Sequence, residues 1–190
     1  QGIADGEVAR AGVLDSGVSR QNRIVERHEV PLAANRVMWV SYDFADDSQE
    51  EQNIFASPLD FEEAGGETIF SLPNGLHGYM LYEADGTRLD EGPDTIVTDP
   101  SQENQNVRNG VSCWGCHPAM LPAADEVRNY VLTGVEFDAQ TKDIVEEIYP
   151  DGADFQSLLD FDTQTFQAAV SATGTDPTLT LEPISDTFQR

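Results

Sequence analysis

Apolar and polar residues alternate most clearly in the middle third of the chain. Residues 36–44 alternate as a half-buried strand does, and residues 67–83 contain two such runs on either side of Pro73-Asn74-Gly75. Asn and Gly tolerate the positive φ of a hairpin turn. A turn at Asp85-Gly86 precedes a third short strand near 87–89, and residues 95–97 favour another. The pattern predicts a small antiparallel β meander.

The two flanking parts have helical spacing instead. Near the N-terminus, residues of like character recur at intervals of three and four over 5–14 and over 19–28. This spacing predicts two helices, the second capped by Ser19. After Pro122 the same spacing predicts helices over 123–133, 138–149, 154–160 and 163–173. The last segment, which contains Pro177 and Pro183, is predicted to be extended.

Together these elements predict one α+β domain over residues 1–190. A chain of 190 residues with 39% hydrophobic residues is long and apolar enough for one core. The expected order is N-terminal helices, a small central antiparallel β meander, and a C-terminal helical half. The parts are a helical arm (1–35), a β-rich part (36–98), a helical part (99–175) and an extended tail (176–190).

The charge of the chain is strongly negative. Asp and Glu number 35 against 10 Lys and Arg, a net charge of −25, and Lys142 is the one lysine. Such a surface repels nucleic acid and favours basic partners or a salty medium. Two interpretations stay open: a solvating surface of a secreted protein, and a docking face for a basic partner protein. No apolar run approaches the length that spans a bilayer.

Residues 113–117, Cys-Trp-Gly-Cys-His, carry the most specific chemistry, and their cysteines are the only two in the chain. C-x-x-C followed by His is the attachment signature of a c-type haem, in which the thiols form thioethers and the histidine binds iron. Redox disulfides and zinc sites also use C-x-x-C. However, Pro118 follows where a thioredoxin-like site has a long helix, and no second pair of ligands completes a zinc site.

The motif therefore predicts one covalently bound haem c per chain. Cys113 and Cys116 are the attachment residues, His117 is one axial ligand of the iron, and Trp114 packs beside the porphyrin.

Positive charge gathers in one of the predicted N-terminal helices. Arg20, Arg23 and Arg27 fall at i, i+3 and i+7, on one face of a helix. Arginine pairs well with carboxylates such as the two haem propionates, so these residues are candidate haem-binding groups. The alternative is a basic face that pairs with the protein's own acidic residues.

The second axial ligand of the iron is less certain, because histidine and methionine are the usual donors and the chain has few. His28 ends the predicted arginine-rich helix and is the first candidate. Met80 is the second and His77 the third. His77 and Met80 have opposite parity on one strand, so at most one of them faces the iron. Met120 starts on the same side of the porphyrin as His117 and is set aside.

Through Cys113, Cys116 and His117 the chain resembles a single-haem c-type cytochrome. Residues 16–20, 70–75 and 108–112 extend the likeness to secreted bacterial monohaem cytochromes. The resemblance implies an electron-transfer protein whose iron cycles between ferrous and ferric states. The alternatives are a haem subunit of a larger redox assembly or homo-oligomer, and a haem enzyme or sensor of peroxide or gases with an open sixth position.

Covalent haem is attached outside the cytoplasm, so we expect a periplasmic or extracellular protein. The start at Gln1 is neither basic nor apolar, and a processed form whose leader has been removed is therefore expected.

Overall fold

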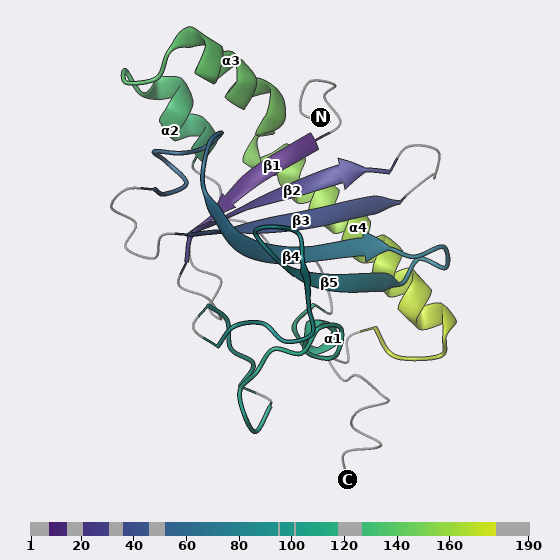
Figure 1. The fold of residues 1–190 in the computed structure, drawn as a ribbon. Helices are drawn as coiled ribbons and strands as arrows, with labels where there is room; N and C mark the ends of the chain where they lie inside the picture. The colour runs from purple at the N-terminus through teal and green to yellow at the C-terminus, as the bar shows by residue number, and fades with distance from the viewer. Residues whose placement is uncertain are drawn as a thin grey trace.

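A six-stranded antiparallel sheet dominates the computed structural model (Figure 1), which describes residues 8–14, 21–30, 36–45, 52–94, 96–100, 102–117 and 127–177. The strands follow one another in the sheet in chain order, as in a simple meander. Their bounds are β1 Val8–Val13, β2 Arg23–Glu29, β3 Val37–Phe44, β4 Glu63–Ser71, β5 His77–Glu83 and β6 Arg88–Leu89. Four helices come later in the described chain: α1 Val111–Cys116, α2 Val127–Thr133, α3 Ala139–Ile148 and α4 Gly152–Ala172.

The prediction of N-terminal helices was wrong, and with it the predicted fold. The described parts of 5–14 and 19–28 form strands β1 and β2, which pair in antiparallel register from Val8 opposite His28 to Val13 opposite Arg23. The sheet is therefore larger than the predicted central meander. The helical signal misled because a spacing of four residues lies on one face of a strand as well as on one face of a helix.

The central β prediction was confirmed in most of its parts. Residues 36–44 contain β3, and β4 and β5 form a hairpin around Gly75, whose φ is 83°. The short third strand is β6. No strand occurs at residues 96–97, the described part of the fourth one expected.

The strand register assigns each side chain to one of two faces. Arg27, Trp39, Ile69 and Tyr79 stand opposite one another across β2 to β5, so they share a face. We call this the α4 face, because the carboxylate of Asp162 in α4 accepts hydrogen bonds from Arg27 and Trp39. The next row, His28, Met38, Phe70 and Gly78, lies on the other face.

Each face of the sheet has its own apolar core. On the α4 face, Trp39 packs with Ile69 and with Phe155 and Leu159 of α4. On the opposite face, Ile24 and Phe44 pack with residues of α2 and α3, namely Val127, Val131, Val145 and Ile148. The sheet thus has α4 packed on one face and residues of the α2–α3 pair packed on the other. Figure 1 shows α4 running behind the strands.

The C-terminal helices were predicted better than the N-terminal part. α2 and α3 lie within the predicted spans, and Asp138 caps α3 by accepting a hydrogen bond from the Thr141 amide. However, α4 is one continuous helix where two were expected. No helix in the described ranges is long and apolar enough to cross a membrane.

Candidate functional site

Helix α1 and its C-cap bring Cys113, Cys116 and His117 together. Gly110, with a φ of 83°, precedes the helix, and its positive φ is one that glycine adopts without strain. Cys113 and Cys116 are then three residues apart, which places both thiols on one side of a helical turn. The amide of His117 donates a hydrogen bond to the carbonyl of Cys113 at 2.9 Å, so the imidazole follows directly from the same turn.

Aromatic side chains fix α1 against the α4 face. The ring of Tyr79 lies 6.4 Å from the ring of His117 and 6.5 Å from that of Trp114, centre to centre. Trp114 also contacts Phe166 of α4, with ring centres 6.2 Å apart. The motif is therefore held between β5 and α4. Trp114 packs on these rings and is not among the residues that line the adjoining cavity.

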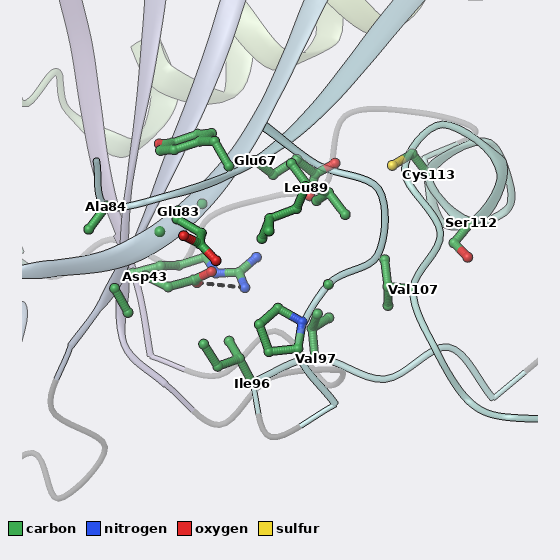
Figure 2. A pocket seen from close by; sticks show the side chains of 18 of the residues that line it. Asp43, Glu67, Glu83, Ala84, Leu89, Ile96, Val97, Val107, Ser112 and Cys113 are labelled. Atoms are coloured by element: carbon green, nitrogen blue, oxygen red, sulfur yellow. Dashed lines mark ion pairs between the residues drawn. The ribbon is translucent and has the colours of Figure 1, made fainter. Parts of the chain in front are cut away.

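A cavity of about 570 Å³ adjoins the motif. This volume lies within the usual range of small-molecule and cofactor sites. Cys113, Cys116 and His117 all line it. Figure 2 shows Cys113 on one side of the cavity and Asp43 and Glu83 on the other. The side chains between them are largely apolar and come from β5, β6 and the segment that leads to α1: Leu81, Leu89, Pro93, Ile96, Val97 and Val107.

Two ion pairs lie in the wall of this cavity, which also includes the carboxylates of Glu83 and Asp85. Arg23 Nη2 lies 2.8 Å from Asp43 Oδ1, and His117 Nε2 lies 3.3 Å from Glu67 Oε1. Burial raises the pKa of Glu67, but the interaction with His117 and the charge of Arg23 together lower it by more. The pKa of Glu67 is therefore below its usual value. Burial raises the pKa of Asp43, and Arg23 offsets only part of that change.

The two cysteines have the character of thiols and not of thiolates. Burial, reinforced by the negative charge of Glu67, raises the pKa of Cys113 to about 12. The pKa of Cys116 is raised by burial and by the charges of Asp99 and Glu67. Redox-active C-x-x-C sites depend on a lowered cysteine pKa, so this environment does not favour thiol–disulfide exchange.

The structure separates the three candidates for the second axial ligand. His28 and Met80 lie in rows of the sheet that face away from α4, whereas His117 contacts Tyr79 on the α4 face. His28 instead makes a 3.0 Å contact with Glu26. The arginine-rich helix that His28 was predicted to end is strand β2, so the reasoning behind that candidate fails. His77 shares the α4 face but does not line the cavity.

The structure also separates the arginines that were predicted to bind haem together. Arg23 lines the cavity and pairs with Asp43, whereas Arg27 is buried elsewhere on the α4 face, where its guanidinium donates to Asp162. Both arginines therefore pair with the protein's own acidic residues. Arg20 and Met120 lie outside the described residues.

Sequence reasoning missed two residues that the structure places at the motif, Glu67 and Tyr79. The signal for Glu67 was present, because it has the same parity as the buried Ile69 on the most clearly patterned strand. A carboxylate at a core-facing position needs a partner, and such a position marks a candidate functional residue.

The described residues contain no group of three or more His, Cys, Asp or Glu arranged to hold a metal ion. No protein-family model, curated protein or solved structure matches the chain.

Proposed function

We propose that this chain is an extracytoplasmic electron-transfer protein with one covalently attached haem c. The observation that carries the proposal is that Cys113, Cys116 and His117 line the same largely apolar cavity. A haem attachment motif needs such a volume beside it, because the porphyrin faces are apolar and its iron must lie next to the histidine. The raised pKa values of both cysteines favour this use over a redox disulfide.

The residues that line the cavity are of the types that a haem site needs. Cys113 and Cys116 would hold the group as thioethers, and a ring nitrogen of His117 would bind the iron. The apolar side chains of Leu81, Leu89 and neighbouring residues would exclude water. Arg23 is the arginine of the described chain that lines the cavity, so it is the candidate partner for a propionate. When bound, the haem would supply one-electron chemistry between ferric and ferrous iron.

The test is production of the chain in a periplasm with a haem-attachment system. The expected result is an intact mass that includes one haem and an absorption spectrum typical of haem c. Replacing both cysteines by alanine should abolish covalent attachment, and His117→Ala should change the spectrum through loss of an axial ligand. His28→Ala is the matched control, since His28 lies on the opposite face of the sheet. A wild-type mass without haem would refute the proposal.

A second candidate function, a haem enzyme or sensor with an open sixth position, is favoured by the placement of His28 and Met80. Both lie on the face of the sheet that is turned away from His117. Carbon monoxide distinguishes the two functions. An iron whose sixth position is open binds the gas at once on reduction, whereas an iron with a strong protein ligand in that position resists displacement.

The surface charge supports a proposal about partners. With a net charge of −25, the protein would attract a basic redox partner and repel acidic ones, so electron exchange should slow as salt is added. Assembly into a larger redox complex or homo-oligomer is the alternative, and the mass in solution would distinguish them.

A further inference from the structure

Arg23 and Asp43 form a largely buried ion pair in the wall of the cavity. Arg23 Nη2 lies 2.8 Å from Asp43 Oδ1, and the two side chains are 14% and 12% exposed. Both residues line the cavity. They stand opposite each other across β2 and β3, and Gly65 and Glu83 continue the same row on the α4 face. Figure 2 shows Asp43 on the side of the cavity opposite Cys113.

The pair leaves hydrogen-bonding capacity unused. Arg23 Nε is buried and has no hydrogen-bond partner, and Asp43 Oδ1, although it lies close to Arg23 Nη2, is not in hydrogen-bond geometry with any described group. Buried polar atoms are normally satisfied, so an unsatisfied donor and an unsatisfied acceptor on one pair call for an explanation. Because both side chains line the cavity, a bound molecule is the partner that the structure leaves room for. The matching group must accept from an arginine and donate to a carboxylate, and a carboxyl group that carries a proton does both.

The charges around Asp43 also favour a proton at this place. Burial and the negative charge of Glu67 raise the pKa of Asp43, and Arg23 offsets only part of that change. Two carboxylates that share one buried site do not both stay ionised, so a second carboxyl group beside Asp43 would bring a proton with it. The described titratable groups that face Asp43 or share its stretch of the cavity wall are one cation and several acids: Arg23 of β2, Glu67 of β4, Tyr82 and Glu83 of β5, and Asp85 in the turn that follows.

We propose that Arg23 and Asp43 form the subsite for one carboxyl group of the bound haem, with a single proton shared between that carboxyl and Asp43. The inference rests on the proposed haem function. In haem the propionates lie on the half of the porphyrin opposite the vinyl groups, which the cysteines of α1 would hold, so the propionates point towards the wall that carries this pair.

The shared proton links electron transfer to pH. Adding one electron to the ferric haem makes the cavity more negative, so the carboxyl pair binds a proton from the solvent more tightly. One electron and one proton then enter together, and the net charge of the cavity stays the same. Where the pH is high enough to remove the proton, the extra negative charge opposes reduction and lowers the midpoint potential.

The experiment measures the reduction midpoint of the haem-loaded protein at an electrode, over the range of pH in which it is folded. The wild-type midpoint should fall as the pH rises, by up to about 59 mV per unit, which is a tenfold change for a one-electron couple. In Asp43→Asn this slope should be lost, because Arg23 then pairs with an ionised propionate. Glu83→Gln is the matched control: it removes a carboxylate from the same wall, but the structure records no ion pair between Glu83 and Arg23, so the slope should stay. Far-ultraviolet circular dichroism checks that each variant is folded.

An infrared difference spectrum of the wild type, reduced minus oxidised, covers the case in which Asp43→Asn does not fold. The C=O stretching band of a protonated carboxyl group should grow on reduction and shift in heavy water. A wild-type midpoint that does not change with pH, a slope that persists in Asp43→Asn, or a spectrum without this band would overturn the subsite and leave the haem function intact. Absence of haem from the wild-type mass would instead overturn the proposed function.

Discussion

His77 makes the stability of this protein depend on pH in the weakly acidic range. Its imidazole is 6% exposed at the start of β5 and stacks on Phe166 of α4, with ring centres 3.9 Å apart. Its Nδ1 is buried and has no hydrogen-bond partner. Burial, together with the nearby charge of His117, lowers the pKa of His77 from 6.5 to about 4.

The direction and size of the effect follow from this shift. Between pH 6.5 and 4 the unfolded chain binds a proton at His77 and the folded protein does not, so acidification favours unfolding. The stabilisation is therefore present above pH 6.5 and is lost as the pH falls towards 4. A shift of this size corresponds to about 3 kcal/mol in full, of which about 2 kcal/mol is lost by pH 5.

The assay is urea unfolding of the wild type and of His77→Phe at pH 7 and pH 5. Phenylalanine keeps an aromatic ring against Phe166 and does not titrate. The free energy of unfolding of the wild type should fall by about 2 kcal/mol more than that of the variant. The comparison at each pH cancels the contribution of the many surface carboxylates. If the two proteins change in parallel, within about 0.5 kcal/mol, the reasoning about His77 is refuted.

Two further predictions concern the packing of the sheet. Asp162→Ala should destabilise the protein by about 3–5 kcal/mol in a urea titration, because it leaves the buried guanidinium of Arg27 without its main partner. The control is Asp160→Ala, at an exposed position of the same helix, which should cost less than about 0.5 kcal/mol. Gly66→Ala should lower the thermal midpoint of unfolding strongly, because the added Cβ would stand 1.8 Å from a backbone carbonyl oxygen of the neighbouring strand. The control is Gly152→Ala, whose added Cβ would have no atom within 4 Å, so the midpoint should stay unchanged or rise. Equal effects in either pair would contradict the packing described.

The part of the fold that could be predicted is the part that local chemistry specifies. The β4–β5 hairpin was predicted because Asn74 and Gly75 suit a tight turn and alternating runs lie on both sides. α3 was predicted because Asp138 is a good cap and its apolar residues recur at helical spacing. In both cases the decisive residues are neighbours in the sequence.

The N-terminal strands could not be predicted, because distant partners decide them. Arg23 and Arg27 are four residues apart, a spacing that fits one face of a helix and one face of a strand. β2 also contains Glu26 and Arg27, which are charged but buried by ion pairs to Arg10 and Asp162. These partners lie 16 and 135 residues away, so the pattern of apolar residues conceals the strand.

The same long-range pairing explains the error in α4. Asp162 interrupts the apolar pattern, and the sequence therefore suggested a break between two helices. In the structure its carboxylate is satisfied by Arg27 and by the Trp39 indole, so a charged residue is compatible with the middle of a buried helix face. The haem assignment of the motif at Cys113 depends on five adjacent residues and on no distant partner, and it stays a prediction.

If the proposed haem is bound, the parity of strand β5 decides which side chains can reach its second axial position. Alternation predicted that His77 and Met80 face opposite sides, and the register confirms it. Because His117 meets the sheet at Tyr79, Met80 is on the far side. His77 lies beyond Tyr79 in the direction away from Leu81 and Glu83, which line the cavity. Among the described residues that line the cavity, Cys113, Cys116 and His117 are the only ones with a sulfur atom or an imidazole ring. Binding of carbon monoxide to the reduced protein is therefore the measurement that divides electron carriage from ligand chemistry.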